Sequence, residues 1–230
     1  MSTVSVVSEL STKIAEAREF IAQTLAGSAA PCITNSFQAE DMVVLHLLRE
    51  IRPDIPVLFL ETGYHFAEVY QYRDDMTARY NLNLVNVKPR QTVAEHEAER
   101  GLLFQTQPDQ CCNLRKVGPL FAALEEYDRW YTGLRRIQSP TRANMKADDS
   151  FPLTSGKTIR KLSPVADWSD KDVWTFAREN AIPLLPLYDA GYTSIGCQPC
   201  TALPSDPSNL RSGRWAGRKL ECGIHIADSK

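Results

Sequence analysis

Short apolar segments alternate with helix-length segments in the early part of the chain, and this alternation restricts the fold more than any other sequence feature. Residues 57–60 form a continuous apolar run, as expected for a strand buried on both faces, and residues 32–34 and 82–87 are two further strand candidates. The intervening segments 40–49 and 66–80 have the pattern and length of helices. Strands and helices alternating in this way predict an α/β fold, a twisted parallel sheet with helices on both faces.

The pattern loosens after about residue 101. We expect a helix over 111–124, a strand over 130–132, a polar loop over 139–155 and a helix beginning near Ser169 or Asp170. Residues 202–219 are rich in Pro, Ser, Gly and Arg, which is typical of a mobile segment. The sequence therefore predicts a single α/β domain over 1–201 and a flexible C-terminal tail over 202–230.

Open parallel sheets bind ligands at the carboxyl ends of their strands. Two such ends are expected here, at the turn after residue 34 and at the turn after residue 60. We therefore predict substrate contacts from Ser36 and Phe37 in the first turn and from Thr62 and Gly63 in the second.

Composition narrows the classes of partner. Among 230 residues, 43% are hydrophobic and the net charge is -2, so a core can form but no global positive field attracts nucleic acid. The sequence contains no apolar run of about 18 residues, so we expect no membrane span. The first residues also lack the basic and apolar regions of a secretory signal, so we expect a cytoplasmic protein.

Thiols stay reduced in the cytoplasm, where clustered cysteines indicate metal binding or catalysis rather than disulfides. Four of the six cysteines form two pairs, Cys111-Cys112 and Cys197-x-x-Cys200. Such pairs suit zinc or an iron–sulfur cluster, or they are small buried side chains without a metal. Adjacent cysteines reach one small ion with difficulty but can take separate corners of a four-iron cube. A [4Fe–4S] cluster is therefore favoured, with Arg115 and Lys116 as neighbouring cations.

A fifth cysteine, Cys222, lies near the C-terminus in the predicted tail. It is either a reactive thiol or an incidental one. Nearby cations promote the thiolate form, and Arg211, Arg214, Arg218 and Lys219 precede it.

Several motifs resemble those of the bacterial assimilatory adenylyl-sulfate reductases. They are Cys-Cys-x-x-Arg-Lys-x-x-Pro-Leu at 111–120, Ser-Ile-Gly-Cys-x-x-Cys-Thr at 194–201, Arg-Ser-Gly-Arg-Trp at 211–215 and Glu-Cys-Gly-Ile-His at 221–225. Segments 60–66 and 132–136 also fit. The sheet region resembles the fold of the ATP pyrophosphatases, which implies an adenine nucleotide α-hydrolase-like architecture. Residues 34–41 lack the Ser-Gly-Gly cradle of those enzymes, which suits a ligand without a pyrophosphate to cleave.

The resemblance implies a two-step reaction. The Cys222 thiolate attacks the sulfur of adenosine 5′-phosphosulfate (APS), AMP leaves, and thioredoxin then releases sulfite from the Cys222 S-sulfonate. Cations on the phosphosulfate would assist because Arg binds phosphate-type oxygens as a fork. The candidates are Lys116, Arg135, Arg136, Arg211 and Arg214, and each is otherwise an ordinary surface charge.

Three alternatives are left open at this stage. The first is a reductase of the 3′-phosphorylated nucleotide (PAPS), or an enzyme that accepts both nucleotides. The second is an ATP pyrophosphatase or an ATP-dependent tRNA thiolase, and the third is a zinc-stabilised interaction module. A homo-oligomer is compatible with all of them.

Overall fold

A computed structural model describes residues 9–206, 209–219 and 221–225. Its described strands form one sheet in the order β3-β2-β1-β4-β6-β5. The strands are β1 (Pro31–Thr34), β2 (Pro56–Leu60), β3 (Asn83–Val87), β4 (Arg129–Tyr131), β5 (Asp148–Pro152) and β6 (Thr158–Leu162). All neighbouring pairs are parallel except β5 and β6. The predicted α/β fold on a mostly parallel sheet is confirmed.

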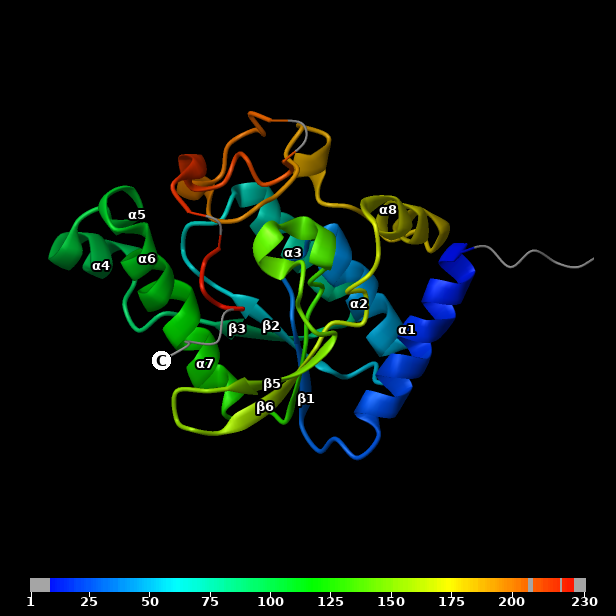
Figure 1. The fold of residues 1–230 in the computed structure, drawn as a ribbon. Helices are drawn as coiled ribbons and strands as arrows, with labels where there is room; N and C mark the ends of the chain where they lie inside the picture. Colours follow the sequence, from blue (N-terminus) through cyan, green and yellow to red (C-terminus); the bar gives the residue numbers. More distant parts are fainter. Residues whose placement is uncertain (1–8, 207–208, 220, 226–230) are drawn as a thin grey trace, which may run out of the picture.

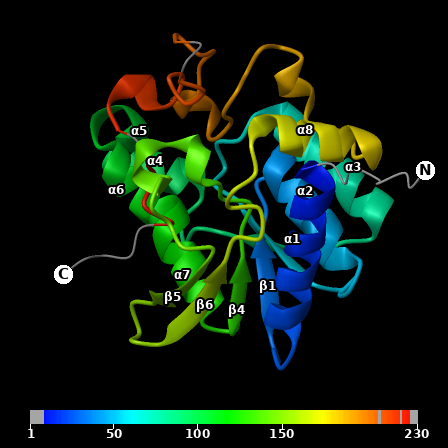
Figure 2. The same ribbon diagram turned by 45° about the vertical axis from the view of Figure 1, so that its right-hand side comes forward.

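Helices cover both faces of the sheet (Figures 1 and 2). One face carries α1 (Glu9–Leu25), α2 (Ala39–Arg49), α3 (Ala67–Tyr80) and α8 (Asp170–Glu179). The other carries α7 (Gly118–Leu124), and α4 (Val93–Arg100), α5 (Leu103–Thr106) and α6 (Pro108–Cys112) lie on the same side of the molecule. Within the described part of the chain, no helix combines the length and the hydrophobicity needed to cross a bilayer.

The central strands send alternate side chains into the two faces. Ile33 packs in the cluster beneath α2, whereas its neighbour Cys32 packs against α7, and Phe59 and Leu58 divide in the same way. All four are almost completely buried. Burying a side chain of this size contributes about 1.5–3 kcal/mol, which explains why short apolar runs were sufficient to locate these strands.

The chain from 139 to 155 is not wholly a loop, as the sequence had suggested. Residues 148–152 form β5, which pairs antiparallel with β6 at the edge of the sheet. Only Phe151 of this strand is buried, and edge strands tolerate the charged residues and the proline that hid its pattern. The helix expected over 111–124 consists of α6, a π-helical segment over Asn113–Val117, and α7.

The order in which successive strands add to the sheet reverses at β1. From this strand the chain moves to β2 and β3 on one side and to β4 and β6 on the other. The loops after β1 and β4 therefore diverge and leave a crevice at their carboxyl ends, where ligands bind in open α/β sheets. The segment after α8 arches over this edge, and residues 221–225 descend beside it (Figure 1).

Candidate active site

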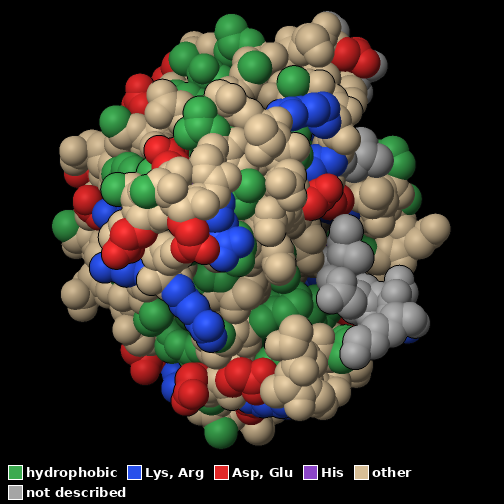
Figure 3. All heavy atoms as spheres, turned by 90° about the vertical axis from the view of Figure 1, so that its left-hand side faces the viewer, with side chains coloured by type: hydrophobic (Ala, Val, Ile, Leu, Met, Phe, Trp, Pro, Cys, Tyr) green, Lys and Arg blue, Asp and Glu red, His purple; other side chains and the backbone are tan. Residues whose placement is uncertain are grey.

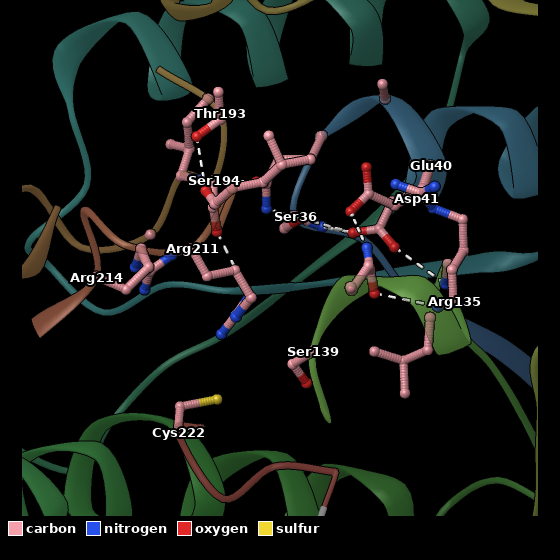
Figure 4. A pocket seen from close by; sticks show the side chains of 18 of the residues that line it. Ser36, Glu40, Asp41, Arg135, Ser139, Thr193, Ser194, Arg211, Arg214 and Cys222 are labelled. Carbon is pink, nitrogen blue, oxygen red and sulfur yellow. Dashed lines mark hydrogen bonds between the residues drawn. The ribbon is translucent and has the colours of Figure 1, made fainter. Parts of the chain in front are cut away.

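A cavity of about 1250 Å³ opens at this edge of the sheet. Its wall combines the turn after β1, the loop after β4, the segment 191–196 and the C-terminal residues. Figure 4 shows two ends. Ser36, Glu40, Asp41 and Arg135 lie at one, here called the Ser36 end, and Arg211, Arg214 and Cys222 lie at the other, the Cys222 end.

At the Ser36 end, the Asp41 carboxylate joins the loops that follow β1 and β4. It accepts hydrogen bonds from the Ser36 backbone N–H at 2.8 Å, from Ser36 Oγ at 2.6 Å and from the Gly133 N–H at 3.0 Å. Burial, together with the charge of Glu40, raises the pKa of Asp41 to about 6 although these bonds favour the anion. The Ile195 N–H donates to Gln38 Oε1 at 2.8 Å, so the same turn also fixes the segment that leads to Cys197.

Three of the predicted substrate contacts do not line the cavity. Phe37 is completely buried and packs edge-to-face on Phe59 and Tyr72, with ring centroids 5.8 and 6.2 Å away. Thr62 is buried, and its Oγ1 lies 3.3 Å from Cys197 Sγ. Gly63 has a φ of +76°, and a Cβ there would lie 2.5 Å from Val93 Cγ2. Phe37 therefore lies in the core, and Thr62 and Gly63 lie beside the cysteine region. Of the four residues predicted in the two turns, Ser36 is the one that lines the cavity.

Arg135 and Arg136 line the cavity, but both are held by partners. Arg135 is buried, and it donates to Asp170 Oδ1 at 2.6 Å and to the carbonyl of Trp168 at 3.2 Å. Arg136 pairs with Asp167 and donates to the carbonyl of Met145 at 2.9 Å. Arg135 lies at the Ser36 end, so the structure does not bring it to Cys222 (Figure 4).

The Cys222 end concentrates positive charge. A Cys222 thiolate interacts electrostatically with Lys116, Arg211 and Arg214. Arg214 is buried with its guanidinium 4.5 Å from the centre of the Trp215 ring, and its Nε has no hydrogen-bond partner among the described atoms. Burial lowers the pKa of Arg214 and lowers that of Arg211 to about 10. Arg211 therefore remains a cation at neutral pH. These groups can hold an anion against the thiol.

The four paired cysteines line one small cavity next to this end. Cys111 and Cys112 lie in the last turn of α6, where a π-helical segment follows, and the Cys200 N–H donates to the carbonyl of Cys197. Burial and the neighbouring thiols raise the pKa of Cys111 to about 12. Among the described residues, no three His, Cys, Asp or Glu side chains are arranged to hold a single metal ion.

The two cations after the cysteine pair have different positions. Arg115 is buried and donates to the carbonyls of Thr62 at 2.7 Å and Gln91 at 3.3 Å, so it holds the turn after β2 in place. Lys116 lines both the small cysteine cavity and the large cavity. Although burial opposes it, the charges of Cys197, Cys222 and Cys112 raise the pKa of Lys116. Lys116 and Trp215 both line the two cavities, so these two residues lie between the cysteine region and the Cys222 end.

The outer face on the side of α4–α7 carries no extended patch of one sign. Figure 3 shows Lys and Arg side chains interspersed with Asp and Glu on this face. This mixture of charges agrees with the small net charge of the chain.

The phosphoadenosine phosphosulfate reductase domain family matches residues 30–203, most of the chain. The chain belongs to this family. A relative, the adenosine 5'-phosphosulfate reductase of Rhodococcus opacus (strain B4), is 46% identical over 193 residues, which cover 82% of this chain and 76% of the relative.

Solved structures share the fold of the family. Phosphoadenylyl-sulfate reductase from Candida auris superposes with a TM-score of 0.71 at 24% identity, covering 87% of this chain and all of that one. FMN adenylyltransferase from Candida glabrata gives 0.64 at 17% identity, covering 89% and 69%. Both likenesses concern architecture, and they support the expected adenine nucleotide α-hydrolase-like fold.

Sequence reasoning missed several residues of the cavity. Asp41 was predicted only as part of the helix over 40–49 and of the segment 34–41, and Ser139 and Arg142 were predicted as part of a polar loop. The acidic side chain at 41 lies in the first turn of α2, at the start of the helix that follows β1, and this position was a usable signal. Nothing local to 139–142 indicated that this segment lies against the C-terminal residues.

Proposed function

We propose that this protein reduces APS to sulfite and AMP, with Cys222 as the nucleophile. The observation that carries the proposal is the position of the Cys222 thiol in one cavity with Lys116, Arg211 and Arg214. A related protein of 46% identity is named adenosine 5'-phosphosulfate reductase. Family membership favours a reductase over an ATP pyrophosphatase and over a zinc-stabilised interaction module.

The cavity suggests how the substrate lies. The adenosine occupies the Ser36 end, and the phosphosulfate lies at the Cys222 end, where Lys116, Arg211 and Arg214 balance its charge. Each charged hydrogen bond of this kind contributes about 1.5–3 kcal/mol. Lys116, Arg211 and Arg214 line the cavity together with Cys222, so one set of charges would contact both the substrate and the nucleophile.

In the first half-reaction, the Cys222 thiolate attacks the sulfur of the sulfuryl group. A bond forms between Sγ and that sulfur, and the sulfur–oxygen bond to the phosphate breaks with its electron pair leaving on AMP. The positive side chains stabilise the charge that develops on the leaving phosphate. The product is a Cys222 S-sulfonate.

In the second half-reaction, a dithiol of thioredoxin type attacks Cys222 Sγ. Sulfite leaves with the electron pair of the sulfur–sulfur bond, and a mixed disulfide forms. The second thiol of the reductant then attacks its partner sulfur and releases Cys222 as a thiolate. The reductant is oxidised to a disulfide, and the substrate sulfur is reduced by two electrons.

Cys111, Cys112, Cys197 and Cys200 would hold a [4Fe–4S] cluster. The four thiols line one cavity, and two of them are adjacent in sequence, a pattern that suits the separate corners of an iron–sulfur cluster better than one zinc ion. When bound, such a cluster supplies a fixed local charge beside the anion site. Lys116 lies between the two sites and would respond to both.

We place the reaction in the cytoplasm, because all six cysteines are free and the mechanism needs reduced thiols. Neither nucleic acid nor membrane has a part in it. A homo-oligomer is compatible with the mechanism.

Sulfite and AMP release test the proposal. Anaerobically purified protein is incubated with thioredoxin, thioredoxin reductase and NADPH, and APS is compared with the 3′-phosphorylated nucleotide. We expect both products in equal amounts from APS and little turnover of the second nucleotide. Equal or faster turnover of the 3′-phosphorylated nucleotide would instead identify a PAPS reductase, and ATP consumption without sulfite would overturn the proposal.

A further inference from the structure

The residue before the nucleophile is anchored by a fork of hydrogen bonds. The Glu221 side chain is only 6% exposed and the side chain of Arg142 11%. Arg142 donates from Nε to Glu221 Oε1 at 2.9 Å and from Nη2 to Oε2 at 2.7 Å. This is a bidentate pair in a desolvated position, the geometry in which an Arg–carboxylate contact is strongest and most directional.

The loop before Arg142 adds neutral donors to the same carboxylate. Ser139 Oγ donates to Glu221 Oε1 at 2.9 Å and Thr141 Oγ1 at 3.0 Å, while Arg211 Nη2 lies 3.6 Å from Oε2. Burial alone would raise the pKa of Glu221, but the hydrogen bonds and charge of Arg142 hold it below its ordinary value. Glu221 is therefore a fully partnered anion, and its carboxylate does not face the substrate unpaired.

The chain beyond the nucleophile is held as well. The His225 ring stacks on Trp130 with centroids 5.5 Å apart, and Lys161 Nζ donates to the His225 carbonyl at 3.0 Å. Ile224 packs against the core beneath α7. Cys222 thus lies between two anchored points, and the Cα of Glu221 is only about 3.8 Å from its own Cα.

We propose that Arg142 and Glu221 are a positioning pair that holds Cys222 over the phosphosulfate for the first half-reaction and is dispensable for the second. The inference rests on the proposed function. Attack on the sulfuryl group needs the thiol fixed in one place, because misplacement of a nucleophile by about 1 Å costs on the order of 10²-fold in rate. Attack by an external dithiol does not need a fixed Cys222, but it needs Cys222 Sγ to be accessible to the reductant.

The test uses anaerobic holoprotein carrying Glu221→Gln, Arg142→Gln or both. The matched control is Glu50→Gln, because Glu50 accepts a similar fork from Arg18 at 2.7 Å and neither residue lines the cavity. Three rates are measured: alkylation of Cys222 by iodoacetamide without nucleotide, resolved by peptide mass; single-turnover formation of the S-sulfonate; and sulfite release from pre-formed S-sulfonate with thioredoxin.

Each single variant should alkylate about tenfold or more faster and form the S-sulfonate about tenfold or more slower, while sulfite release stays within about twofold. The double variant should match the singles, because either change removes the same fork. The Glu50→Gln control should match the unsubstituted protein in all three rates.

Two results would overturn the positioning role proposed for Arg142 and Glu221. One is unchanged alkylation and sulfonation in both single variants, and the other is a double variant whose defect is the product of the two. Should Glu221→Gln fail to fold, Ser139→Ala with Thr141→Val removes only the neutral donors and should move the rates the same way by less; no movement counts against the pair. If the unsubstituted protein forms no S-sulfonate while alkylation still responds, the proposed function fails and the anchoring role stands.

Discussion

A single methyl group placed at Gly196 should weaken substrate binding through Arg214. The backbone of Gly196 lies directly against the Arg214 guanidinium, and a Cβ at position 196 would lie 2.0 Å from Nη2 and 2.5 Å from both Cζ and Nη1. No ordinary contact between carbon and nitrogen is that short, so Gly196→Ala must displace the guanidinium. Arg214 is buried over Trp215, which leaves it little room to move without leaving the anion site.

The size of the effect follows from that displacement. An ordinary contact is about 3.5–4.0 Å, so the guanidinium has to move by roughly 1.5 Å. Hydrogen bonds to a phosphosulfate oxygen span only about 2.7–3.2 Å between heavy atoms, so a shift of this size breaks them. Losing one charged hydrogen bond costs about 1.5–3 kcal/mol, or about 10- to 150-fold in Kd.

Binding is best measured on anaerobic protein that also carries Cys222→Ser, since this background cannot consume APS. Gly196→Ala, Arg214→Ala and the double variant are titrated with APS by calorimetry, and iron content is determined for each because Cys197 is adjacent. We expect a similar loss of affinity in all three. The reasoning is refuted if Gly196→Ala binds APS as tightly as its background, or if its loss adds in full to that of Arg214→Ala.

Three further changes test other parts of the structure. Cys197→Ala should lose its iron and the broad visible absorbance of the cluster, and it should unfold at a lower urea concentration, because ligand binding contributes to folding. Burial lowers the pKa of His65 from 6.5 to about 4, so the unfolded chain takes up this proton first as the pH falls. The stabilisation from the neutral His65 ring is complete above pH 6.5 and is lost as the pH falls toward 4. Between about pH 7.5 and about 5.5, the unsubstituted protein should therefore lose about 1 kcal/mol more unfolding free energy than His65→Gln in urea unfolding. Asp128→Ala removes the acceptor for Ser28 Oγ at 2.6 Å and for the Ala29 N–H at 3.0 Å, and it should cost about 2 kcal/mol by the same method; an unchanged midpoint would contradict the role of this turn before β1.

The parts of the fold that the sequence predicted are those with a local cause. The runs that became β1 and β2 are apolar because both faces of these strands are buried, and that pattern is visible in a few residues. The strand β5 escaped because an edge strand buries only Phe151 and keeps its charged residues in water. Its pairing with β6 depends on the sheet as a whole.

The candidate site also contains some residues that a local sequence pattern predicted and others whose position depends on the whole fold. The spacing of the cysteines identified residues that the fold does bring to one cavity, since four thiols in two pairs have few other uses. Phe37 was misplaced because its neighbours Phe59 and Tyr72, distant in sequence, draw it into the core. The mobility expected of residues 202–230 stays a prediction, and residues 207–208, 220 and 226–230 lie outside the described part of the chain.

The sequence also could not show which acidic residue each arginine pairs with. Arg135 and Arg142 stand seven positions apart in similar polar surroundings. Only the fold shows that Asp170 holds the first and Glu221 the second.

The most direct measurement of the central claim is the mass of the Cys222 peptide after anaerobic incubation with APS in the absence of any reductant. The account predicts that this peptide gains one SO₃ group in step with AMP release, that thioredoxin removes the group as sulfite, and that Cys222→Ser gains nothing. AMP released with no added mass on Cys222, or the SO₃ group found on another cysteine, would contradict it.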